Sequence, residues 1–160
     1  PGQGEFGDGA ANLKKQGMFA PIQQWVAEDK PYLGICVGYQ LIFEKGDESP
    51  DAEGLGIIAG CVKKFPNVGL KIPHMGWNSI TPVDTSHPIW NELPEEPYFY
   101  FVHSYYPEPT GQDDVAATCD YALPFAAAVT RGKLIATQFH PEKSQHNGLQ
   151  LLKNFVAIEA

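Results

Sequence analysis

The residue of this sequence best placed to do chemistry is Cys36, because glycines stand two positions before it and two positions after it. The run Gly34-Ile35-Cys36-Val37-Gly38 is the thiol counterpart of the Gly-x-Ser-x-Gly elbow, in which a strained strand-to-helix turn holds a nucleophile. Side chains at the two flanking positions would collide, and glycine removes that collision. The alternative is a buried structural cysteine, although such a cysteine needs no glycine on either side.

The elements expected around Cys36 predict how its sulfur reacts. Residues 32–35 form a short apolar run typical of a buried strand, and from Val37 onward the apolar side chains recur at helical spacing. A thiol at a helix N-terminus is expected to have a lowered pKa, because the helix dipole and unpaired amides favour the thiolate. The next backbone N–H, that of Val37, would point to where an oxyanion forms during attack on a carbonyl carbon.

Among the five histidines of the chain, His140 has the neighbours that a general base needs. The apolar run of residues 134–139 ends at His140, and Pro141 keeps this histidine out of helical geometry. Residues two apart in an extended chain point to the same side, so Glu142 can reach the imidazole. Cys36, His140 and Glu142 would then be nucleophile, base and orienting carboxylate. The alternative is a loop histidine beside a solvated surface acid.

These two motifs together carry a resemblance to a known family. Residues 34–40, Gly-Ile-Cys-Val-Gly-Tyr-Gln, and residues 139–144, Phe-His-Pro-Glu-Lys-Ser, resemble the corresponding motifs of class I (triad) glutamine amidotransferases. The resemblance covers nearly the whole chain. It implies an enzyme that hydrolyses L-glutamine to glutamate through a thioester on Cys36 and passes the ammonia to a synthase. No cofactor and no metal are expected.

The resemblance also implies which residues hold the oxyanion and the substrate. The family has a Pro-Gly-x-Gly turn beside the nucleophile, here residues 1–4, in which an amide of Gly2 or Gln3 would complete the oxyanion hole with Val37. The family's His-Ser-Tyr motif, here residues 103–105, holds the α-carboxylate and amino group of glutamine. The residues implied in substrate binding are Gly4, Gln40, Ser104 and Tyr105.

Residues 73–78, Pro-His-Met-Gly-Trp-Asn, bear on the type of amidotransferase. As bare chemistry, an aromatic ring, a thioether and two polar tips suit core packing and an interface anchor equally well. The segment resembles the Pro-x-Met-Gly-Trp-Asn signature of the glutaminase subunits of imidazole glycerol phosphate synthases, which lies against the cyclase barrel near the ammonia route. This implies a TIM-barrel cyclase partner in histidine biosynthesis. The implied interface residues are Pro73, His74, Met75, Gly76, Trp77 and Asn78.

Composition limits the other partners. The 160 residues suit a single domain over residues 1–160, and the net charge of -8 argues against nucleic acid or an anionic membrane as partner. Three cysteines without a C-x-x-C pair fit a reducing cytoplasm rather than a disulfide frame or a zinc site. Residues 2–7 match the dinucleotide fingerprint G-x-G-x-x-G, but no strand feeds that loop, so nucleotide binding is not expected.

We therefore expect an α/β fold of the class I amidotransferase type, a three-layer, flavodoxin-like arrangement with a mixed, mainly parallel sheet and Cys36 at the end of a central strand. Helices are predicted within residues 8–30, where Trp25 is expected in the core, and over residues 147–158. Residues 44–53 are expected to be a solvated acidic loop. The family has a βα unit before residues 1–4, so we expect that this portion is missing and that activity is weak or absent.

Three functional hypotheses remain open from the sequence. The first is a histidine-pathway glutaminase that releases ammonia only when its cyclase partner is engaged. The second is another class I amidotransferase or a free glutamine hydrolase, which needs no cyclase. The third is a noncatalytic interaction domain, because the N-terminal portion is absent. Alkylation by a glutamine-like chloroketone separates the enzymes from the interaction domain, since an enzyme's Cys36 reacts far faster than Cys61 and Cys119.

Overall fold

The computed structural model describes residues 4–159, in which nine consecutive strands separate the N-terminal helices from the C-terminal one. The helices are α1 (Phe6–Lys15), α2 (Phe19–Ala27), α3 (Val37–Gln40) and α4 (Gln145–Glu159), with 3-10 turns η1 (Pro88–Trp90) and η2 (Pro141–Lys143). The strands are β1 (Tyr32–Ile35), β2 (Lys45–Gly46), β3 (Gly60–Lys64), β4 (His74–Ser79), β5 (Thr81–Pro82), β6 (Tyr98–His103), β7 (Tyr105–Pro109), β8 (Val115–Tyr121), β9 (Leu123–Arg131) and β10 (Leu134–Thr137). No helix in the described range is long and apolar enough to cross a bilayer.

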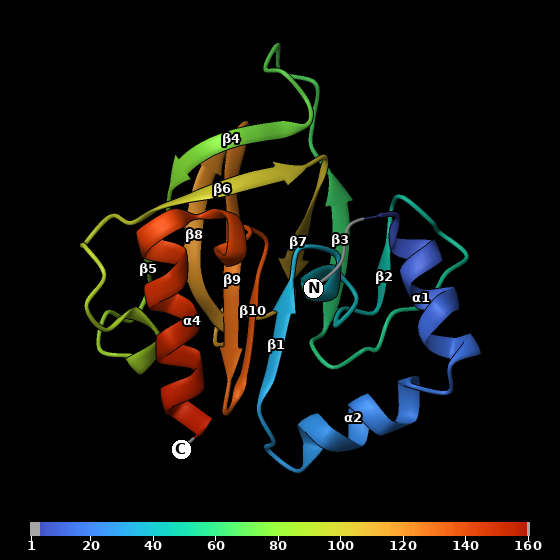
Figure 1. Ribbon diagram of the computed structural model, residues 1–160. Coiled ribbons are helices and arrows are strands. Elements are labelled where there is room, and N and C mark those ends of the chain that lie inside the picture. Colours follow the sequence, from blue (N-terminus) through green and yellow to red (C-terminus); the bar gives the residue numbers. More distant parts are fainter. Residues whose placement is uncertain (1–3, 160) are drawn as a thin grey trace.

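The largest sheet has the strand order β1-β10-β9-β8-β5 (Figure 1). Within it β1 and β10 run parallel, whereas β10, β9, β8 and β5 pair antiparallel. The expectation of a mainly parallel sheet is therefore wrong, although the sheet is mixed. The physical reason lies in the connections: Ala122 alone joins β8 to β9, and Gly132 and Lys133 join β9 to β10. Links this short make hairpins, whereas parallel neighbours need a crossover of a dozen or more residues.

The strand that carries Cys36 lies at an edge of this sheet. In the described part of the chain, β1 pairs with β10 alone, in the register Tyr32 to Leu134 through Ile35 to Thr137. The expectation of a central strand is thus corrected. An apolar sequence shows that a strand is buried on its faces, but it does not show how many neighbours the strand has.

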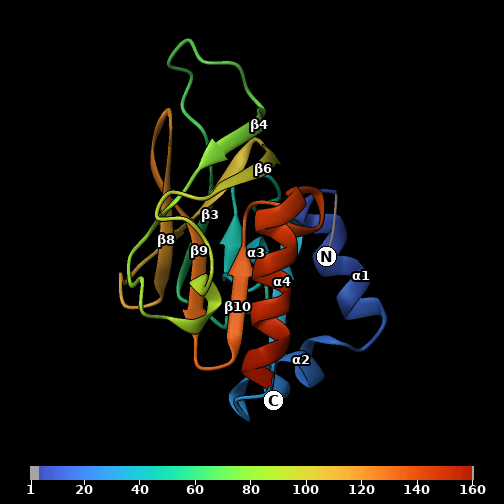
Figure 2. The same cartoon turned by 60° about the vertical axis from the view of Figure 1, so that its left-hand side comes forward.

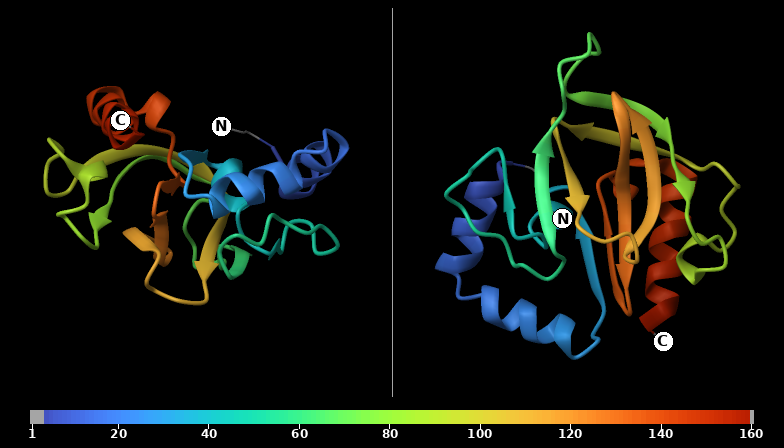
Figure 3. Two further views of the ribbon diagram at one scale, coloured as in Figure 1. Left: turned by 90° about the horizontal axis from the view of Figure 1, so that it is seen from below. Right: turned by 180° about the vertical axis from the view of Figure 1, so that it is seen from behind.

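Helix α4 packs along one face of the large sheet, and two smaller sheets complete the arrangement (Figure 2). One has the order β2-β3-β7, and the other is the antiparallel pair of β4 and β6, which crosses the end of the large sheet. Seen from behind, β3, β7, β8 and β9 face the viewer while α4 lies on the far side (Figure 3). The α/β class is confirmed by these elements.

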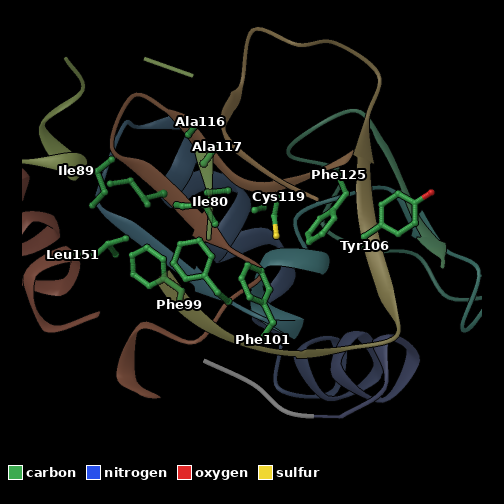
Figure 4. Close-up of a cluster of buried hydrophobic side chains, with 14 of the residues drawn as sticks. Ile80, Ile89, Phe99, Phe101, Tyr106, Ala116, Ala117, Cys119, Phe125 and Leu151 are labelled. Carbon is green, nitrogen blue, oxygen red and sulfur yellow. The ribbon is translucent and has the colours of Figure 1, made fainter. Parts of the chain in front are cut away.

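Two apolar clusters hold the elements together. One gathers β6, β7, β8, β9, β10 and α4 around aromatic rings, several of which appear in Figure 4. Within it the rings of Phe99 and Phe139 stack with centroids 4.1 Å apart, which fixes the residue before His140 against β6. The other cluster packs Phe6 of α1 and Tyr39 of α3 against β9 and β10. Both clusters therefore meet at the segments that flank Cys36 and His140.

The N-terminal helices differ from expectation in one respect. Residues 8–30 are largely helical, and the two helices are separated near Gly17, whose φ of 66° lies in the left-handed region that favours glycine. Trp25, however, is 47% exposed, so its prediction as a core residue is wrong. Its Nε1 donates a hydrogen bond to the carbonyl oxygen of Pro31 at 2.7 Å, and the ammonium of Lys30 lies 4.8 Å from its ring. These contacts hold the ring against the start of β1 without burying it.

Candidate active site

Cys36 stands at a strained corner between β1 and α3. Its φ of 54° and ψ of -110° are rare for a residue with a side chain. A Cβ added at Gly34 would lie 2.9 Å from the carbonyl oxygen of Gly38 and 3.1 Å from the Cβ of Ala136. The chain therefore folds back on itself so tightly around Cys36 that position 34 has no room for a side chain. The strand, turn and helix predicted from the sequence are confirmed, although α3 is only four residues long.

Pairing of β1 with β10 brings the two distant motifs together. The backbone N–H of Cys36 donates to the carbonyl oxygen of Thr137 at 2.8 Å, directly beyond the paired residues Ile35 and Thr137. Three residues further along, His140 lines the same pocket as Cys36, and this pocket has a volume of about 270 Å³. A space of this size between a thiol and an imidazole suits a small polar substrate.

The imidazole of His140 is held by one nitrogen and is free at the other. The ring is 1% exposed, and its Nδ1 lies 2.6 Å from Oε1 of Glu142. Because a carboxylate accepts hydrogen bonds, Nδ1 carries a proton, and in the neutral ring Nε2 presents a lone pair. This Nε2 is buried and has no hydrogen-bond partner in the described part of the chain. An orphaned buried nitrogen of this kind is available to a proton from the pocket.

The main chain of His140 is fixed as firmly as its ring. The backbone N–H of His140 donates to the carbonyl oxygen of Tyr100 at 2.9 Å. The hydroxyl of Ser144 donates to the carbonyl oxygen of His140 at 2.6 Å and accepts from the N–H of Tyr100 at 2.9 Å. Ser144 thus ties η2 to β6, so the position of the imidazole depends on three segments that are far apart in the sequence.

The thiol of Cys36 is not pre-ionised, which corrects an expectation. Burial raises the pKa of Cys36 to about 11, the backbone N–H of Val37 opposes the rise, and the charge of Glu142 adds to it. A helix of only four residues carries too small a dipole to offset the loss of hydration. The sulfur therefore rests as a neutral thiol at neutral pH and needs a base to become a nucleophile.

The pocket gathers most of the residues that the resemblance implied. Beside Cys36 and His140 its lining includes Gly4, Val37, Gln40, Ser104 and Tyr105. Gly2 and Gln3, implied in the oxyanion hole, lie outside the described residues. No group of three or more His, Cys, Asp or Glu side chains within residues 4–159 is placed to hold a metal ion.

The same pocket includes residues that sequence reasoning did not single out. Val102 and Glu48 line it, and Glu48 belongs to a loop expected to be merely solvated. The Oε2 of Glu48 accepts a hydrogen bond from the N–H of Phe6 at 2.8 Å, which ties this loop to the start of α1. Gln138, buried behind Cys36, was also missed. Its position two residues before His140, in the run of residues 134–139 that was predicted to be extended, was the signal that could have found it.

The segment expected at a partner interface forms β4 and alternates in exposure. Met75 is 55% exposed and Trp77 47% exposed, whereas His74 between the rings of Tyr121 and Phe101 is buried. Gly76 has a φ of 131° with open space where a Cβ would stand. Pro73 lines the pocket with Cys36. Asn78 donates through Nδ2 to the carbonyl oxygen of Asp120 at 3.0 Å. The segment therefore reaches from the pocket to a half-exposed apolar surface.

Comparison with solved structures identifies the fold. A structure described as "Crystal structure of glutamine amidotransferase" superposes with a TM-score of 0.71 at 18% sequence identity, over 98% of this chain and 75% of that chain. At this identity the likeness concerns the fold alone. It identifies the class I amidotransferase type of α/β fold that was expected.

Comparison of sequences identifies the family. Residues 2–158 match the family described as "Glutamine amidotransferase class-I". Imidazole glycerol phosphate synthase subunit HisH of Acinetobacter baylyi is 50% identical over 157 residues, which are 98% of this chain and 76% of that protein. The HisH subunit of Methylococcus capsulatus is 49% identical over 99% of this chain and 76% of that protein. The chain therefore belongs to the class I glutamine amidotransferases and, within them, to the HisH subunits of imidazole glycerol phosphate synthase.

Proposed function

We propose that Cys36, His140 and Glu142 form the catalytic triad with which this glutamine amidotransferase hydrolyses L-glutamine. The observation that carries the proposal is the state of His140. Its Nδ1 is held at 2.6 Å by Glu142, and its buried Nε2 is unpartnered and lines the pocket that holds the Cys36 thiol. Since the pKa of Cys36 is raised to about 11, thiolate formation depends on a base, and this nitrogen is suited to take the proton.

The proposed reaction has two halves. In the first, Nε2 of His140 takes the thiol proton while the sulfur of Cys36 bonds to the amide carbon of glutamine. The imidazolium returns that proton to the amide nitrogen, the C–N bond breaks, and ammonia leaves a thioester. In the second, His140 takes a proton from water as the water oxygen bonds to the same carbon, and the imidazolium returns that proton to the sulfur as the C–S bond breaks. The products are glutamate and the regenerated thiol.

We propose that backbone N–H groups stabilise the negative charge that develops on the substrate oxygen in both halves. The N–H of Val37 lies beside the sulfur, as its effect on the thiol pKa indicates, and an amide of Gly2 or Gln3 is proposed as the second donor. The rim of the pocket would hold the substrate. Its amino and carboxylate groups are assigned to Gly4, Gln40, Ser104 and Tyr105, which line the pocket.

We further propose that ammonia passes to a TIM-barrel cyclase subunit in histidine biosynthesis. The HisH relatives are described as subunits of imidazole glycerol phosphate synthase, which implies a partner subunit. The exposed Met75 and Trp77 of β4 are suitable anchors for it, because half-exposed thioether and indole groups are enriched at interfaces. Pro73, which begins this segment, lines the catalytic pocket, so the proposed interface is continuous with the site where ammonia forms.

Three broader assignments accompany this proposal. Residues 1–160 are taken as a single domain with three-layer, flavodoxin-like architecture. The reaction is placed in a reducing cytoplasm, where the free thiols of Cys36, Cys61 and Cys119 are stable. No nucleic acid and no membrane take part.

The proposal is tested by labelling and by turnover. A glutamine-like chloroketone should modify Cys36 far faster than Cys61, and labelling should be slowed by glutamine. In the presence of the cyclase, Cys36→Ala should abolish glutamine-dependent synthesis and leave ammonia-dependent synthesis intact. A matched control is Cys61→Ser, because Cys61 lies in β3 outside the pocket. Equal labelling of Cys36 and Cys61 would instead support the noncatalytic interaction domain.

A further inference from the structure

Gln138 is a buried polar side chain that the reaction described above does not use. It is 0% exposed, and its Nε2 lies 3.8 Å from the sulfur of Cys36, within reach of an N–H···S hydrogen bond. Its backbone N–H donates to the carbonyl oxygen of Ala127 at 2.8 Å, so β9 fixes its main chain. The effect of this amide on the sulfur depends on whether its nitrogen, a donor, or its oxygen, an acceptor, faces the sulfur.

The neighbouring hydrogen bonds settle the orientation of this amide. Nε2 of Gln40 lies 3.2 Å from the carbonyl oxygen of Tyr105 and 3.1 Å from Oε1 of Gln138. A backbone carbonyl can only accept, so the amino group of Gln40 faces Tyr105 and its second hydrogen is given to Gln138. Gln138 must then present its oxygen to Gln40. Its own amino group is thereby turned to the sulfur of Cys36.

The carbonyl oxygen of Tyr105 is itself held in place by a second donor. Nδ1 of His103 lies 2.8 Å from it, and burial lowers the pKa of His103 to about 3, so the ring is neutral and donates through Nδ1. β6 ends at His103 and β7 begins at Tyr105, so the network is anchored where these two strands meet. Fully satisfied buried networks of this kind are rigid.

We propose that Gln138 is a positioning residue that donates an N–H to the sulfur of Cys36 and favours the reactive thiolate. This proposal rests on the proposed function, in which Cys36 is the nucleophile. The charged and titratable groups that act on the sulfur or line its pocket are Glu142, Glu48, Lys143, His140, His103 and Tyr105. The two carboxylates oppose the thiolate and Lys143 favours it, and uncharged donors such as Val37 N–H and Gln138 help to offset burial.

The test measures thiol reactivity instead of turnover, so it does not depend on substrate binding. Gln138→Met keeps the length of the side chain and removes the donor, and Gln138→Glu keeps the shape but presents only acceptors. Thr137→Val is the matched control, because Thr137 is equally buried and its Oγ1 donates to Phe139 instead of the sulfur. Alkylation of Cys36 by iodoacetamide is followed between about pH 6.5 and 9 on the Cys36 peptide by mass spectrometry.

The expected result is a loss of reactivity that follows the donor. Gln138→Met should alkylate about tenfold more slowly than the wild type at each pH, and Gln138→Glu more slowly still. The alkylation rate of Cys36 in Thr137→Val should stay within about twofold of the wild-type rate. Circular dichroism checks separately that each variant is folded. If folded Gln138→Met reacts as fast as the wild type, the proposal is overturned.

A second measurement keeps the proposal testable if the Gln138 variants do not fold. The side-chain amide resonances of Gln138 are compared between ¹⁵N-labelled wild type and Cys36→Ala. They should differ between the two proteins, and unchanged resonances would overturn the donor role. Failure of the proposed function gives a different result, because the glutamine-like chloroketone would then label Cys36 no faster than Cys61 in the wild type. If the chloroketone labels Cys36 fast but the Gln138 variants alkylate like the wild type, only the present inference is rejected.

Discussion

Nδ1 of His74 lies 2.9 Å from Nε2 of His103, and this contact joins β4, with its exposed Met75 and Trp77, to the network around Tyr105. Because His103 donates to Tyr105 through Nδ1, its Nε2 must accept, and His74 must donate. Nε2 of His74 then accepts from Nδ2 of Asn78 at 3.3 Å. Every tautomer in the pair is therefore fixed, and each ring must be neutral.

Acid should consequently destabilise the protein through this pair. Burial lowers the pKa of His74 to about 4 and that of His103 to about 3, below the usual histidine value of about 6.5. Between the folded and unfolded pKa values, the unfolded chain binds more protons than the folded chain. The contribution of the neutral histidines to the stability is therefore complete above about pH 6.5 and is lost as the pH falls toward 4 and 3. We expect the free energy of unfolding to fall by about 2 kcal/mol or more between pH 7.5 and pH 4.5.

Urea unfolding at several pH values measures this effect. His74→Gln should lower stability at pH 7.5 and flatten its dependence on pH, because one of the two depressed histidines is gone. His146→Gln is the control, since His146 is exposed on α4 and lies outside the pair. A pH dependence that is equally steep in His74→Gln and the wild type would contradict the account.

The raised pKa of Cys36 predicts a particular pH profile for alkylation. With a pKa of about 11, roughly one molecule in ten thousand carries the thiolate at pH 7, and the rate should rise about tenfold per pH unit up to pH 9 or higher. Cys119 is 3% exposed with its pKa raised to about 12 by burial, so it should react more slowly throughout. A rate for Cys36 that levels off below pH 8 would show instead a stable thiolate.

Much of the site could be predicted from the sequence because it depends on local geometry. The corner at Cys36 follows from its flanking glycines. The contact of His140 with Glu142 was also predicted, although Glu142 reaches the ring from the 3-10 turn η2 and not from the extended chain that the prediction assumed. Other features depend on neighbours that no local pattern reveals. At Cys36, burial raises the thiol pKa by more than the four-residue helix can lower it, and β1 lies at an edge of the sheet. Both features come from tertiary packing. Trp25 has helical spacing typical of a core face, yet little of the described chain covers it.

Replacing Gly34 tests the tight turn. A methyl group in Gly34→Ala would lie 2.9 Å from the carbonyl oxygen of Gly38 and 3.1 Å from Ala136, so β1 and α3 must separate. We expect a loss of about 1 to 3 kcal/mol in unfolding free energy, together with slower labelling of Cys36. Gly111→Ala is the control, because a Cβ there meets nothing within 4 Å. Thermal or urea melts compare the two variants, and equal stability would show that the turn can accommodate a methyl group at position 34.

Trp77→Ala and Met75→Ala test the proposed interface. Because both side chains are about half exposed, the isolated chain should lose less than about 1 kcal/mol of stability. Binding to the cyclase, measured by titration calorimetry, should weaken about tenfold or more for Trp77→Ala, as for a buried aromatic anchor. Val156→Ala on α4 is the control, since Val156 is 62% exposed on a different face. Unchanged affinity in both β4 variants would place the cyclase elsewhere.

Glu142→Gln tests the role of the carboxylate that orients His140. The carboxylate accepts from Nδ1 at 2.6 Å and leaves the lone pair on Nε2, whereas an amide can donate to Nδ1 and move the proton to Nε2. The altered tautomer cannot take the thiol proton, and the imidazolium loses its countercharge. We expect glutamine turnover with the cyclase present to fall at least about a hundredfold in kcat, with little change in KM. Glu96→Gln removes the same charge at an exposed position outside the pocket and should behave as wild type. Turnover of Glu142→Gln within a fewfold of wild type would mean that His140 is oriented by its buried surroundings alone.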